Sequence, residues 1–74
     1  MLINEAVKKA METDAMIIRG EWKRTTYGRM AIKPTNTEDA CMGVFKAIND
    51  LPQETHRCWN PKAEDLTADD WELI

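Results

Sequence analysis

Serine is absent from this chain, and His56 is its only histidine. A Ser-His-Asp triad therefore cannot be built. The three glycines fit neither the phosphate-binding loop nor the dinucleotide-binding spacing. Cys41 and Cys58 allow at most one disulfide, which is too few for a secreted disulfide scaffold, and with His56 they fall short of a four-ligand zinc site. We therefore expect a binding protein that is not an enzyme and that carries no cofactor or metal.

Long hydrophobic runs are also missing, since no apolar stretch approaches the roughly 20 residues that cross a bilayer. Acidic Glu5 and basic Lys8 and Lys9 interrupt the first ten residues, unlike the apolar centre of a signal peptide. We predict a cytoplasmic protein with reduced thiols. Its 74 residues make one domain, and a chain of this size buries only about 60% of its unfolded surface. We therefore expect a dimer or tetramer to add stability.

Charge is unevenly distributed around a net value of -3. Residues 1–33 hold seven Lys and Arg against four Asp and Glu, whereas residues 34–74 hold three against nine. The negative total argues against a nucleic-acid duplex as partner, because duplex-binding domains are usually strongly basic. The local cluster of Arg19, Lys23, Arg24, Arg29 and Lys33 suits a small anionic ligand, or else forms the solvated face of a hairpin.

The first third of the chain predicts a helix followed by a strand. Ile3, Ala6 and Ala10 belong to an apolar stripe at helical spacing, with Asn4 as the expected N-cap and Asp14 beyond the helix end. Residues 16–18 are apolar and include β-branched side chains, which favours a short buried strand. Residues 20–28 are expected to form a loop or an irregular hairpin.

The middle of the chain is more ambiguous. Residues 28–33 alternate polar and apolar side chains and predict a strand that stops at Pro34. The stretch 37–50 favours a second helix, although Gly43 weakens it and a strand at residues 42–45 is the alternative. Residues 53–57 are predicted to be polar loop. The expected fold is α+β: a small antiparallel β-sheet with the N-terminal amphipathic helix packed on it and a short second helix.

The last sixteen residues, WNPKAEDLTADDWELI, are the most specific part of the sequence. Trp59 precedes an Asn-Pro turn, and Asp65 or Thr67 is placed to cap a helical turn. Residues 71–74 alternate sides and predict a closing strand. The simplest interpretation of Trp59 and Trp71 is that both anchor the core of a small domain.

This ending resembles the phage family that includes the second type of Thoeris anti-defence protein. Members of that family combine an amphipathic helix, a basic strand leading to Trp, and a Trp-x-Pro…Asp-Leu-x-Ala-Asp-Asp-Trp-Glu ending. The corresponding segments here are INEAVKKAMETD, AMIIRGEW and the ending quoted above, with a weaker match through IKPTN and Cys41. Longer members carry an extended central segment, which this chain replaces with the short stretch 37–50.

The resemblance implies a homo-oligomer that sequesters a cyclic nucleotide signal molecule, of the cyclic ADP-ribose or cyclic dinucleotide type, without cleaving it. Aromatic rings would then stack on bases and cations would meet phosphates, with Asp70 and Trp71 holding the fold around the pocket. The expected ligand-binding residues are Arg19, Trp22, Lys23, Tyr27, Arg57, Trp59 and Asn60.

Two other functions fit the same residues. A protein-interaction module would dock Met42, Phe45 and the tryptophans on a host protein and would retain no nucleotide. A nucleotide hydrolase would form a product, but the sequence offers no evident general base for one. The state of the ligand after release distinguishes the three possibilities.

Overall fold

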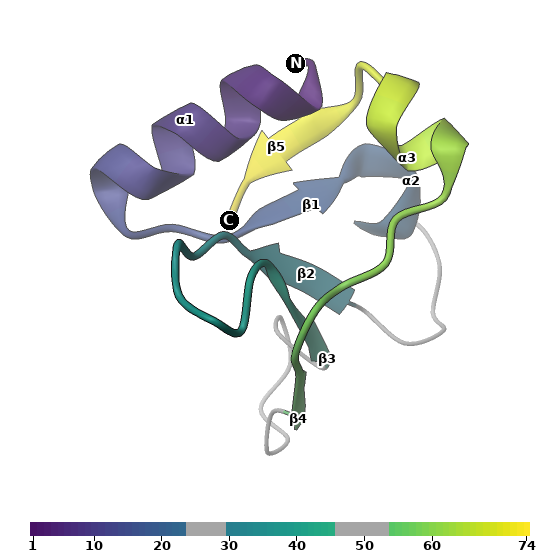
Figure 1. Ribbon diagram of the computed structural model, residues 1–74. Coiled ribbons are helices and arrows are strands. Elements are labelled where there is room, and N and C mark those ends of the chain that lie inside the picture. Colours follow the sequence, from purple (N-terminus) through teal and green to yellow (C-terminus); the bar gives the residue numbers. More distant parts are fainter. Residues whose placement is uncertain (24–29, 46–53) are drawn as a thin grey trace.

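A five-stranded antiparallel sheet and three helices make up the described parts of the computed structural model, which are residues 1–23, 30–45 and 54–74 (Figure 1). The strand order is β4-β3-β2-β1-β5, so the last strand of the chain lies beside the first. The predicted α+β fold is confirmed. In chain order the elements are α1 (Ile3–Thr13), β1 (Ile17–Arg19), α2 (Gly20–Lys23), β2 (Met30–Lys33), β3 (Met42–Phe45), β4 (Glu54–His56), α3 (Ala63–Thr67) and β5 (Trp71–Leu73).

Helix α1 forms as its apolar stripe predicts, and it lies along β5 and β1 (Figure 1). Its small buried residues, Ala6 and Ala10, let the helix approach the sheet closely. The helix ends at Asp14 in the left-handed conformation, with φ of 55°, where the Asp14 N–H donates to Ala10 O. The predicted cap at Asn4 is wrong: Leu2 is the N-cap, since the helix begins one residue before Asn4.

The centre of the sheet is buried on both faces. On the α1 face, Ile17 lies opposite Ile32, and both pack with Ala6, Ala10 and Trp71 in the core. Neighbouring residues on a strand point to opposite faces, so Ile18, Ala31 and Val44 occupy the other face, where they are also buried. Residues 17 and 18 are thus both core positions, which explains the continuous apolar run.

Three local predictions needed correction. The stretch 42–45 is strand β3, which confirms the alternative to the second helix, because it pairs along its length with β2 from Lys33↔Met42 to Met30↔Phe45. Residues 54–56, predicted to be loop, form strand β4 and pair with β3. Residues 20–23, also assigned to loop, form the short helix α2.

The short helix near the C-terminus and the closing strand at residues 71–73 are confirmed as α3 and β5. Strand β5 also lies beside the start of the chain, since Trp71 N–H donates to Met1 O at 3.1 Å and the Met1 ammonium donates to Trp71 O at 2.9 Å. Among the described residues, no helix is long and apolar enough to cross a membrane.

Candidate functional site

Arg19, the last residue of β1, holds three carboxylates together. Its Nε donates to Asp70 Oδ1 at 3.0 Å, and its Nη1 donates to Asp65 Oδ1 at 3.1 Å. Its Nη2 lies 3.2 Å from Glu21 Oε2. The Arg19 side chain is only 11% exposed, so these contacts connect β1, α2, α3 and the approach to β5 in a partly desolvated place. The planar guanidinium has the geometry for several such bonds at once.

Asp65 is the buried carboxylate of this network, with 6% of its surface exposed. Its Oδ2 accepts the Lys62 N–H at 2.9 Å, so Asp65 closes the first turn of α3 from inside the helix, whereas Lys62, rather than the predicted Asp65 or Thr67, is the N-cap. Its backbone oxygen accepts the Trp71 indole N–H at 2.9 Å. One residue therefore closes the helix, pairs with Arg19 and orients Trp71.

Asp70 holds the first turn of α2 in a similar way. Its Oδ2 accepts the Glu21 N–H at 3.0 Å, while its Oδ1 pairs with Arg19. Burial opposes ionisation of Asp70, but the hydrogen bonds from Glu21 N–H and Arg19 outweigh it and lower the pKa of the carboxyl. The same pairing with Asp70 raises the pKa of Arg19. Both groups are therefore held in their charged forms.

The three tryptophans meet beside this network in a mutual edge-to-face cluster, which we call the tryptophan triad. Ring centroids are 5.3 Å apart for Trp22 and Trp71, 5.9 Å for Trp59 and Trp71, and 6.5 Å for Trp22 and Trp59. Trp71 is fully buried, whereas Trp22 and Trp59 are half-buried. The Arg19 guanidinium carbon lies 5.9 Å from the centre of the Trp22 ring, within cation–π range. Two indoles thus reach the surface on a fixed support.

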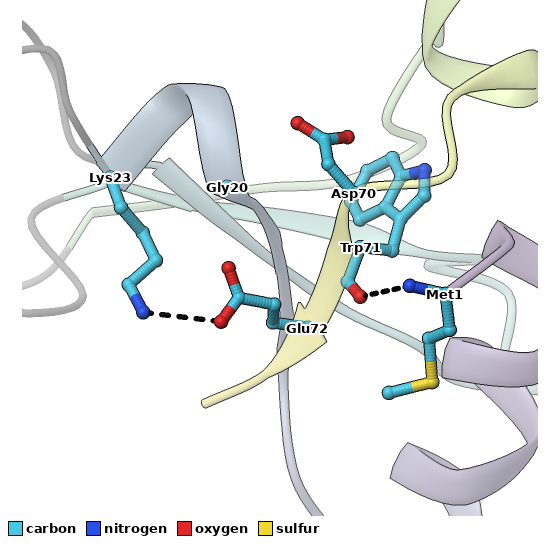
Figure 2. Close-up of a pocket in the computed structure, with 6 residues that line it drawn as sticks. All are labelled: Met1, Gly20, Lys23, Asp70, Trp71 and Glu72. Carbon is cyan, nitrogen blue, oxygen red and sulfur yellow. Dashed lines mark hydrogen bonds and ion pairs between the residues drawn. The ribbon is translucent and has the colours of Figure 1, made fainter.

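An open depression of about 520 Å³ lies between α2 and β5 (Figure 2). Lys23 and Glu72 extend toward each other from those two elements, with Lys23 Nζ 3.4 Å from Glu72 Oε1. Both side chains are about half exposed, so water screens their pairing. The residues lining the depression are Met1, Gly20, Lys23, Asp70, Trp71 and Glu72.

The predicted ligand-binding residues are only partly brought together. Arg19, Trp22 and Trp59 meet at the triad, and Lys23 follows Trp22 on α2. Arg57 instead faces the 38–39 turn, with its Nε 2.6 Å from Asp39 Oδ1. The exposed Asn60 follows Trp59 directly. Tyr27 lies outside the described residues.

Sequence reasoning missed the carboxylates that surround Arg19. Asp65 and Asp70 are separated from Arg19 by 46 and 51 positions, so no local pattern connects them. The sequence feature that could have indicated these partners is the excess of acidic over basic residues in the C-terminal half. The expectation that Asp70 and Trp71 hold the fold agrees with the contacts described above.

Comparison with known proteins gives one result. No curated protein and no solved structure matches this chain. The model of the Thoeris anti-defence 2-like domain matches residues 1–74, the whole chain. That match covers the α1 helix, the basic strand, the tryptophan triad and the carboxylates that fix it. This protein therefore belongs to the Thoeris anti-defence 2-like family.

Proposed function

We propose that this anti-defence protein binds a nucleotide second messenger, of the cyclic ADP-ribose or cyclic dinucleotide type, and holds it without cleaving it. Family membership supports the broader role in phage anti-defence. The observation that carries the finer proposal is the tryptophan triad, in which half-buried Trp22 and Trp59 rest on fully buried Trp71. Stacking on an indole contributes about 1–3 kcal/mol per base.

The hydrogen bonds that hold the residues of the triad support holding rather than turnover. Tight binding benefits when the binding groups are ordered before the ligand arrives, because less side-chain entropy is lost. Trp71 is fixed through its indole N–H, and Trp22 follows Glu21, whose N–H is held by Asp70. The surface offered to a base is therefore preorganised.

The phosphates in this proposal are met by Lys23 and Arg57 rather than by Arg19. Lys23 is half exposed, and among the residues that the structure describes its ion-pair contact is the 3.4 Å one to Glu72. Arg57 is 66% exposed and pairs with Asp39 in solvent. Arg19, by contrast, is enclosed by three carboxylates, which an incoming phosphate would have to displace. Arg19 instead positions Trp22, and Asn60 offers an amide beside Trp59.

A thermal-shift screen of the purified protein against cyclic ADP-ribose isomers and cyclic dinucleotides tests this proposal. A ligand present at about 100 times its Kd adds about 2.7 kcal/mol, which for a domain of this size raises the Tm by roughly 10–20 °C. The Trp59→Leu variant should lose most of that shift. Leu66→Ser is the matched control, because Leu66 is exposed on α3 outside the triad.

A panel without any shift would overturn the nucleotide proposal. The protein-docking alternative would then take its place, with host-protein capture as its test. The apolar residues predicted for such docking, Met42 and Phe45, are half-buried on β3. The hydrolase alternative would appear as a shift that decays as the ligand is consumed.

A further inference from the structure

Cys41 and Cys58 lie on neighbouring stretches of chain. Strands β3 and β4 pair with Gly43 opposite His56 and Val44 opposite Thr55. Cys41 precedes β3 by one residue, and Cys58 follows β4 by two. Backbone hydrogen bonds connect these stretches beyond the strands: Trp59 N–H donates to Cys41 O at 2.8 Å, and Cys58 N–H donates to Asp39 O at 2.9 Å.

These bonds limit the distance between the two cysteines. The Cys58 Cα lies two bonds from the Trp59 nitrogen, and the Cys41 Cα lies two bonds from its own oxygen. With standard bond lengths, the 2.8 Å hydrogen bond keeps the two Cα atoms within roughly 7.6 Å of each other. Disulfides span Cα separations of about 4.4–6.8 Å, so this upper limit lies slightly above the bridging range and is compatible with a bridge.

The two thiols differ in exposure in a way that suits stepwise oxidation. Both are free; Cys58 is exposed and Cys41 is half-buried against the core. Cys58 also has a φ of 55°, a left-handed conformation that L residues seldom adopt. The Cys58 thiol is therefore the one open to reagents, whereas Cys41 is the more enclosed of the two.

We propose that Cys41 and Cys58 form a thiol–disulfide site that is closed by low-molecular-weight disulfides such as oxidised glutathione. The Cys58 thiolate attacks one sulfur of the reagent, forming a protein–glutathione disulfide and releasing one glutathione thiolate. The Cys41 thiolate then attacks the Cys58 sulfur, forming the internal disulfide and releasing the second glutathione. The protein loses two electrons and two protons, and one oxidised glutathione becomes two reduced ones.

Closure would fasten β3 to the segment that carries Trp59. Cys41 packs against the same core cluster as Trp59, and the Trp59 N–H bonds to Cys41. A bridge here would restrain the edge of the tryptophan triad in the folded protein. It would also reduce the conformational freedom of the unfolded chain. The site itself does not depend on what the triad binds.

Glutathione redox titration of the whole protein tests the proposal. Reduced protein at low micromolar concentration is equilibrated at pH 8 over a series of ratios of oxidised to reduced glutathione. The samples are quenched with acid, and the mass of the intact protein is measured by mass spectrometry. A parallel series in concentrated urea measures closure in the unfolded chain. The Cys41→Ser and Cys58→Ser variants serve as matched controls that cannot close.

We expect the folded protein to lose two hydrogen atoms, with peptide mapping linking Cys41 to Cys58. The ratio of oxidised to reduced glutathione that closes half of the folded protein should be at least about tenfold lower than the ratio needed in urea, because a bridge that fits the fold stabilises it. The oxidised protein should melt at least about 5 °C higher than the reduced one, a shift that both variants lack. The proposal is overturned if the folded protein needs a glutathione ratio equal to or higher than that needed in urea. A glutathione adduct that persists at Cys58, or a bridge that forms only between molecules, would overturn it as well.

Discussion

The indole N–H of Trp71 donates a 2.9 Å hydrogen bond to the backbone oxygen of Asp65. The carboxylate of Asp65 pairs in turn with Arg19. Among the described residues, the most buried aromatic ring is therefore hydrogen-bonded to the backbone of the residue that carries the most buried charge. The two residues are six positions apart in the chain, and the turn between α3 and β5 brings them together.

Replacing Trp71 with Phe tests this bond. Trp71→Phe keeps an aromatic ring but removes the donor and leaves a small cavity, so we expect a loss of about 2 kcal/mol in the free energy of unfolding. Trp59→Phe is the control, because the Trp59 ring is only half-buried, and it should cost about half as much. Urea titration followed by far-UV circular dichroism measures both. Equal losses would show that the bond contributes nothing.

The Arg19–Asp70 pair makes a separate prediction. Asp70→Asn weakens the acceptor for Arg19 Nε and for the Glu21 N–H, and it leaves Arg19 with less compensation in a partly buried place. We expect a loss of about 2 kcal/mol. The neighbouring Asp69→Asn changes an exposed carboxylate and should stay within about 0.5 kcal/mol. Similar losses in the two variants would mean that net charge, rather than the pair, is responsible.

Stability should fall in acid partly through Asp70. Its pKa in the folded protein is below the ordinary value of 3.8, and an unfolded chain restores that value. A lowered folded pKa contributes stability that is complete above the unfolded pKa and is lost as pH falls through the folded one. The difference in unfolding free energy between wild type and Asp70→Asn should therefore be constant above about pH 5 and shrink below it. A difference independent of pH down to 2.5 would exclude this linkage.

Lys23 offers a way to weaken ligand binding without disturbing the fold. Its contact with Glu72 is exposed at both ends, so Lys23→Gln should change stability by less than about 0.5 kcal/mol. If Lys23 meets a phosphate, the variant should bind the nucleotide at least about tenfold more weakly, a loss of about 1.4 kcal/mol. Calorimetric titration of wild type, Lys23→Gln and Lys8→Gln separates these outcomes. Equal affinity in all three would remove Lys23 from the site.

The sequence was most informative where local pattern decides structure. The apolar stripe of α1 and the turn chemistry near Asp65 need only neighbours within one or two helical turns. Strand β3 was ambiguous because a short apolar run such as MGVF suits a strand or a buried helix turn. Its pairing with β2 resolved the ambiguity, and pairing between separate segments is invisible in a local window.

Strand β4 and the role of Arg19 were missed for the same physical reason. All three residues of Glu54–His56 are exposed, and the segment has no hydrophobic alternation to mark it as a strand. Arg19 carries a charge that suits phosphate, but its partners, Asp65 and Asp70, come from the far end of the chain. The three tryptophans were predicted individually, whereas their meeting at one place depends on β5 lying beside β1.

The most direct test of sequestration is the chemical state of the ligand after release. The protein is incubated with the nucleotide that gives the largest thermal shift, separated from free ligand, heated to unfold it, and the supernatant is quantified by chromatography and mass spectrometry. We predict recovery of the intact nucleotide in a fixed molar ratio to protein, with recovery abolished in Trp59→Leu. Recovery of a cleaved product, or of no nucleotide from the wild-type protein, would contradict the account.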